Sequence, residues 1–166
     1  MAMTIKTEGL DDLNAMLARL GDKAQEVASR SLYEGAGVVA DAMKAAVNSI
    51  AAEPQQPKNK PPAKTPARLP TPEEKAAVTG ATGIAKFRKE GGEVHTLIGV
   101  TGQGGGYTTI NGRKKAIRLI ARSINSGTSF MHKQPVFRRA ASQSKSAAVA
   151  AIVAKAEELF QEFINS

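Results

Sequence analysis

Apolar residues recur at helical spacing near the start of the chain. Leu10, Leu13, Leu17 and Leu20 precede Gly21-Asp22, a pair suited to ending one helix and capping the next. We therefore expect a short helix that ends at Gly21 and a second, Ala-rich helix over about residues 23–51. The apolar stripe expected on this second helix comprises Ala28, Leu32, Val39, Met43, Ala46 and Ile50.

The end of the chain predicts another long helix. Pro135 suits the first turn of a helix, and an apolar stripe continues from there to the C-terminus. Its members are Phe137, Ala141, Ala148, Ile152, Leu159 and Phe163. In the earlier helix, Gly35 and Gly37 flank Ala36, and we interpret this small surface as a place of close helix packing.

Alternating patterns predict strands between the long helices. Residues 84–90 and 93–100 alternate and are joined by Gly91-Gly92, which is typical of an antiparallel hairpin with a two-residue turn. Residues 3–8 predict a short edge strand, and residues 107–110 a further strand before Asn111-Gly112. Residues 113–125 predict a basic helix with an apolar face formed by Ile117, Ile120, Ala121 and Ile124.

Residues 53–72 hold seven of the eight prolines, which excludes helix and central strand. We expect an extended, basic arm; a simple linker is the alternative. Four cations are expected to project from it: Lys58, Lys60, Lys64 and Arg68. Residues 1–166 are thus expected to form one α+β domain, in which a small antiparallel sheet centred on residues 84–100 packs against the two long helices.

Composition narrows the classes of function. Aromatic residues make up only 4% of the chain, so the core is lean, and the absence of cysteine excludes disulfides and thiolate sites. No stretch approaches the roughly 20 apolar residues of a membrane helix, and no signal peptide is present, so we expect a soluble protein made in the cytoplasm. No membrane partner is expected.

The net charge of +8 is unevenly distributed. Residues 54–156 carry eighteen basic and four acidic side chains, whereas residues 1–53 carry five basic and eight acidic ones. Two interpretations stay open. The cationic middle could face a polyanion such as DNA, or it could meet the acidic ends of neighbouring copies in head-to-tail order.

No pattern of catalytic, metal-binding or cofactor-binding residues is evident. His95 and His132 lack the several converging donors that a metal site needs, and the loop at 102–106 lacks the Gly-Lys-Ser/Thr ending of a phosphate-binding loop. A helix-turn-helix is disfavoured because roughly ten residues separate Asn125 from Pro135, whereas that motif needs a turn of about 3–4 residues. We therefore expect no enzyme and no cofactor.

One segment, residues 121–141, resembles the central motif of the siphophage tail-completion, or neck, protein family, which includes minor tail proteins of lambdoid phages. In that family a helix leads into a Gly-Thr turn, and a Pro-Phe-Leu-Arg-Pro-Ala block then opens a long C-terminal helix. Asn125-Ser126 and Arg139 depart from the family pattern. The matching residues here, which look structural, are Gly127, Thr128, Pro135, Phe137, Arg138 and Ala140. Gly127 suits a backbone position with positive φ, and Thr128 can bond locally to the backbone there. Phe137, in the first turn of the last helix, should anchor that turn to the core.

The resemblance implies a structural virion protein that forms a homo-oligomeric ring at the phage head–tail joint and completes the tail or connector. Its implied partners are other copies of itself, the tail terminator or tail tube, and the head connector, with non-specific contact to packaged DNA. The alternatives are a non-specific nucleic-acid-binding protein, a tail terminator or a head adaptor. The cations expected to contact subunits or DNA are Lys58, Lys60, Lys64, Arg68, Arg113, Lys114, Arg118 and Arg122. The Pro-rich arm is expected to reach a neighbouring subunit or to line the DNA passage, so deleting residues 55–70 should abolish head–tail joining and leave the monomer folded.

Overall fold

A computed structural model describes residues 10–53, 67–90, 93–100, 106–110 and 112–164. Its helices are α1 (Leu10–Ser49), α2 (Pro72–Ala81), α3 (Ile117–Ser126) and α4 (Val136–Ile164). Its strands are β1 (Thr82–Ile84), β2 (Arg88–Glu90), β3 (Glu93–His95), β4 (Ile98–Val100), β5 (Tyr107–Ile110) and β6 (Arg113–Ala116). The expected α+β class is confirmed. The predicted strand at 3–8 lies outside the described residues.

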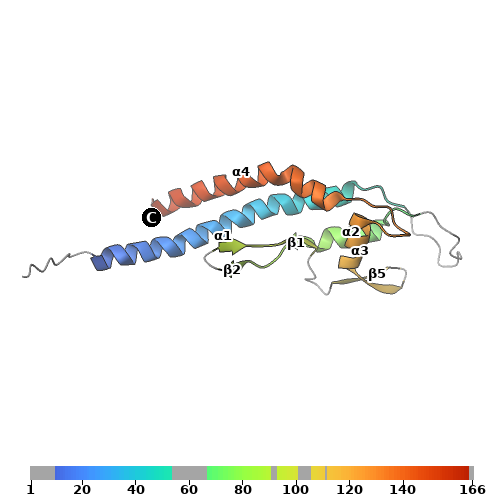
Figure 1. Cartoon of the computed structure of the whole chain (residues 1–166), viewed down its shortest axis with the longest axis horizontal. Coiled ribbons are helices and arrows are strands. Elements are labelled where there is room, and N and C mark those ends of the chain that lie inside the picture. Colours follow the sequence, from blue (N-terminus) through green and yellow to red (C-terminus); the bar gives the residue numbers. More distant parts are fainter. Residues whose placement is uncertain (1–9, 54–66, 91–92, 101–105, 111, 165–166) are drawn as a thin grey trace, which may run out of the picture.

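The molecule is elongated and is built around α1, the longest helix (Figure 1). Helix α4 packs along one side of α1, and the hairpin of β1 to β4 lies on another side. The predicted break at Gly21 is wrong, because α1 runs unbroken through it. A helical glycine costs only about 1 kcal/mol, and no proline occurs before Pro54 to stop the helix.

Helix α4 packs closely on α1 at Gly35, as the small residues there predicted. A Cβ built on Gly35 would collide with the Ile152 side chain and would lie 2.9 Å from the Ala148 carbonyl oxygen. Gly37 has nothing within 4 Å of such a Cβ and takes no part. Of the expected stripe, Met43 and Ile50 are buried as predicted, whereas Ala28, Leu32, Val39 and Ala46 are not. The helix faces two partners, and its buried residues are Val27, Ser31, Gly35, Ala36, Ala40, Met43 and Val47.

The predicted hairpin over residues 84–100 is confirmed, but it is interrupted. Ile84 pairs with Ile98 in the β1–β4 ladder, and Arg88 pairs with His95 in the β2–β3 ladder. Four steps along one strand therefore match three along the other, which defines a one-residue β-bulge. The bulge interrupts the continuous alternation expected over residues 84–90, while Lys86 and Arg88 beside it are exposed and Phe87 is partly buried. It turns Phe87 towards α1, where its ring lies 6.0 Å from that of Tyr33.

A second hairpin replaces the first turn of the predicted basic helix. The expected strand at 107–110 is confirmed as β5, but Arg113–Ala116 pairs with it as β6 rather than starting the helix at Arg113. The reason is the turn: Gly112 has φ +71°, which glycine adopts without strain and which suits a tight hairpin. Helix α3 therefore begins at Ile117, and its predicted apolar face is buried or packed against the core.

The main core lies at one end of the molecule, where α1 ends and α2, α3 and β5 meet. It is formed by Val47, Ile50, Val78, Ile110, Ile120, Ala121, Ile124 and Met131. Helix α2 was not expected. It begins with a capping box, in which the Thr71 side chain accepts from the Glu74 amide and the Glu74 carboxylate accepts from the Thr71 amide, and Pro72 occupies the first turn.

Candidate interaction surfaces

The segment that carries the family resemblance joins α3 to α4. Gly127 has φ +76°, as predicted, and its amide donates to the Ser123 carbonyl at 2.9 Å. A Cβ at this position would lie 3.0 Å from Lys133 Cβ. Gly127 is therefore required both by its backbone conformation and by the close approach of the returning chain.

The residues after Gly127 form a compact turn. The amide of Thr128 donates to the Met131 carbonyl at 2.9 Å, and the Thr128 hydroxyl accepts from the Phe130 amide at 3.4 Å, which confirms the expected local bond. Met131 is buried in the core. Pro135 immediately precedes α4 rather than lying inside its first turn, and Phe137 packs against the core as expected.

Arg68 does not project as the sequence suggested; it forms an ion pair with the buried Glu74. The Arg68 Nη1 and Nη2 atoms lie 2.8 and 2.7 Å from the two Glu74 carboxylate oxygens. Lys115 Nζ lies 3.4 Å from the same carboxylate. Burial alone would raise the pKa of Glu74, but the Arg68 hydrogen bonds, the Thr71 amide and the charges of Arg68 and Lys115 together lower it. Glu74 is therefore a buried carboxylate that stays charged.

The backbone around Arg68 fixes the C-terminal end of the Pro-rich segment. The Arg68 amide donates to the Phe130 carbonyl at 3.0 Å, and the His132 amide donates to the Arg68 carbonyl at 2.9 Å. The Glu53 amide donates to the Pro70 carbonyl at 3.1 Å, so residues 53 and 70 lie together. The predicted arm thus ends before residue 67, while residues 54–66, with Lys58, Lys60 and Lys64, lie outside the described part of the chain.

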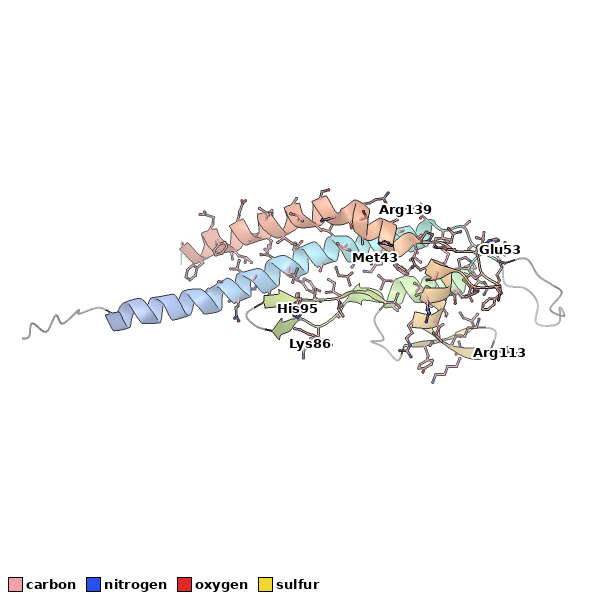
Figure 2. All side chains as sticks on the ribbon, in the orientation of Figure 1. Met43, Glu53, Lys86, His95, Arg113 and Arg139 are labelled. Carbon is pink, nitrogen blue, oxygen red and sulfur yellow. The ribbon has the colours of Figure 1, made fainter. Side chains whose placement is uncertain are left out.

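Six exposed cations gather towards the end of the molecule that holds the main core. We call this surface the basic end: Arg113, Lys114, Arg118, Arg122, Arg138 and Arg139. Figure 2 shows Arg113 and Arg139 on opposite sides of it. Within the described residues, no carboxylate lies within 4.0 Å of Arg118, Arg122, Arg138 or Arg139. Lys114 Nζ lies 4.9 Å from the centre of the exposed Tyr107 ring.

An open groove of about 510 Å³ lies between α1, α4 and β3, in the other half of the molecule. We call it the apolar groove. Ser31 lies at its floor, and the buried Ser31 hydroxyl has no hydrogen-bond partner among the described residues. Phe160 on its wall is 43% exposed. The groove is lined by Ala24, Gln25, Val27, Ala28, Ser31, Leu32, Val94, Ile152, Ala156 and Phe160.

The apolar groove continues along α4 as an exposed stripe. Val149, Val153 and Phe160 follow one another at helical spacing, and the first two are also about half exposed. Contiguous exposed apolar surface of this kind marks interaction sites. Pattern analysis of the sequence missed this surface because a stripe at helical spacing looks the same whether it meets a helix of the same chain or a partner.

His95 and His132 are both exposed. In the part of the chain that the structure describes, no three His, Cys, Asp or Glu side chains are placed to bind a metal ion. None of the described helices is long and apolar enough to cross a membrane. Comparison with protein-family models, curated proteins and solved structures finds no match.

Proposed function

We propose that this protein is a non-enzymatic structural subunit of a tailed phage particle. Copies associate into a ring at the joint between head and tail and complete the tail or the connector before the two are joined. The subunits assemble in the host cytoplasm and remain in the virion. The proposal rests on the resemblance at residues 121–141 and on the surfaces described above.

The resemblance is supported by the positions of its residues. Gly127 has the backbone conformation that only glycine adopts readily, Thr128 closes the turn, and Phe137 anchors the start of α4 on the core. Each has a structural role, as a motif of a non-enzymatic family requires. Arg138 is exposed and belongs to the basic end.

The observation that carries ring formation is the apolar groove. A lone subunit would leave this groove and the Val149–Val153–Phe160 stripe in water, at a cost of about 25 cal/mol per Å² of apolar surface. A second copy of the chain is the occupant we propose. Head-to-tail contacts that place two different patches together close into rings when the rotation allows.

The matching patch on the neighbouring copy is the outer face of the β1–β4 hairpin. Leu97 is 70% exposed, more than any other large apolar residue described. The pairing of Arg88 with His95 places Arg88 on the same outer face, and Lys86 nearby is exposed. On the copy that provides the groove, the exposed Glu157 lies next to Ala156 of the groove wall, and so at the edge of the groove. Leu97 would fill the groove, with basic and acidic side chains opposed around it.

Electron microscopy of particles made with a groove variant tests this proposal. Phe160→Ser should give separate, finished heads and tails, because the ring no longer closes. Leu119→Ser is the matched control: Leu119 is 56% exposed but lies on α3, outside both patches, and should give joined particles. Joined particles with Phe160→Ser would reject the groove contact, and abnormally long tails in its place would indicate a tail terminator.

A further inference from the structure

The charge of the basic end is not balanced within the chain. From residue 94 to residue 156 there is no Asp or Glu, and ten Lys and Arg. Among the described residues, Lys115 is the one cation of β6 that reaches a carboxylate, that of Glu74. The six cations of the basic end are exposed, and no described carboxylate forms an ion pair with them.

Contacts between copies would leave most of this positive charge unbalanced. Several of the described carboxylates are already engaged: Glu26 with Lys23 and Arg30, Asp41 with Lys44, and Glu158 with Lys155. Each chain carries a net charge of +8, so any closed set of copies multiplies this excess instead of cancelling it. A polyanion is therefore the kind of partner that would balance it.

The arrangement of the cations fits a backbone of phosphates better than a folded acidic surface. Arg118 and Arg122 lie one turn apart on one face of α3, and Arg113 and Lys114 precede them on β6, so the cations extend along two successive elements. Arginine binds phosphate with a planar pair of donors. Duplex DNA presents about one negative charge per 1.7 Å of its axis, which suits such an extended array.

We propose that four cations of the basic end, those on β6 and α3, form a binding site for the phosphate backbone of duplex DNA, without preference for base sequence. They are Arg113, Lys114, Arg118 and Arg122. Nothing at this end resembles a device for reading bases. Helix α3 is too far along the chain from α4 to form a helix-turn-helix, and the Tyr107 ring at this site has Lys114 Nζ 4.9 Å from its centre. Binding through this end does not depend on ring formation.

Fluorescence anisotropy of the full chain with a labelled duplex of arbitrary sequence, measured over a series of salt concentrations, tests this site. With four contacts to phosphate, a plot of the logarithm of the binding constant against the logarithm of the salt concentration should have a slope of about −4. The double variant Arg118→Gln/Arg122→Gln should make the slope shallower by about 2 and weaken binding at least tenfold at low salt. Thermal melting followed by circular dichroism verifies that the variant is folded.

The matched control removes the same charge elsewhere. Lys23→Gln/Arg30→Gln also takes away two exposed cations, but on the N-terminal half of α1, and should leave the slope unchanged. Equal losses in the two double variants, or no duplex binding by the unaltered chain at low salt, would overturn the proposal. So would unchanged duplex binding combined with lost self-association in Arg118→Gln/Arg122→Gln, since the basic end would then be a protein contact. Sedimentation of the unaltered chain tests the ring separately.

Discussion

Two glycines in α1, two residues apart, have opposite roles. Gly35 lets the α4 backbone approach until the Ala148 carbonyl and the Ile152 side chain occupy the space of a Cβ. Gly37 has empty space around it and contributes only the conformational freedom that weakens a helix. The same residue type is therefore required at one position and a liability at the other.

Substituting alanine at each position should separate these roles. Gly35→Ala should lower the melting temperature, because the new methyl group has to displace the α4 backbone, and overpacking of this kind costs about 1–3 kcal/mol. Gly37→Ala should raise the stability by up to about 1 kcal/mol through helix propensity. Thermal melting of the two variants compares them, and a Gly35→Ala protein as stable as Gly37→Ala would contradict the close contact.

Glu74 is a residue whose charge should govern stability in acid. Its pKa is lowered in the folded protein, so its contribution is present above the unfolded value, about 4.3, and is lost as the pH falls through the lower folded value. Glu74→Gln should lower the free energy of unfolding at neutral pH by about 3 kcal/mol, because Arg68 loses its charged partner. Denaturant unfolding at pH 7 and below pH 4 measures both effects. A variant that loses stability with acid as steeply as the natural chain would show that other carboxylates dominate.

At the scale of the elements, the ends of the Pro-rich segment are joined independently of the segment itself. Glu53 bonds to Pro70 through the backbone, and its carboxylate accepts from the Leu69 amide at 3.2 Å. Arg68 bridges α2 and the turn before α4 through its side chain and its backbone. Residues 68–70 thus belong to the folded domain, although by composition they belong to the arm.

Because of this arrangement, we expect a shorter deletion than that of residues 55–70 to leave the stability of the protein unchanged. Replacing residues 55–65 with a short Gly-Ser linker should leave the melting temperature nearly unchanged, because residues 53 and 70 are already held together. Deleting residues 55–70 should destabilise the protein, because it removes Arg68 and leaves the buried Glu74 without its main partner. Melting curves of the two deletion variants test whether residues 68–70 belong to the folded domain or to the arm. Equal melting temperatures would assign them to the arm.

At the scale of the whole molecule, the two halves differ in how completely they bury their apolar surface. The half with α2, α3 and the β5–β6 hairpin has a compact core and a charged exterior. The other half has two long helices and an open apolar groove. The first half thus buries its apolar residues within the chain, whereas the second leaves apolar surface open, as the proposed subunit contact requires.

A mixing experiment should reveal whether the proposed contact joins two different patches. Phe160→Ser retains an intact hairpin face, and Leu97→Ser retains an intact groove. Each variant alone should sediment as a monomer, and an equimolar mixture should form dimers that grow no further, because each pair makes one good contact. Analytical ultracentrifugation measures these species. Larger assemblies in either variant alone would place the subunit contact elsewhere.

The sequence by itself determined the features that depend on local chemistry. These were the two long helices from their apolar periodicity, the hairpin from Gly91-Gly92, the positive φ of Gly127, and the position of Phe137 on the core. The sequence also contains the capping-box residues at Thr71 and the pair Asn111-Gly112, two signals that predict the start of α2 and the hairpin turn before β6.

Only the tertiary structure decided which elements meet and which surfaces stay open. The bulge that turns Phe87 inward, the pairing of Arg68 with Glu74, and the contact at Gly35 each join residues far apart or offset in the chain. Periodicity reports that a face is apolar, but what covers that face depends on long-range packing. For the same reason, the groove beside Phe160 and the unopposed cations of the basic end became visible only when the helices and hairpins were placed in space.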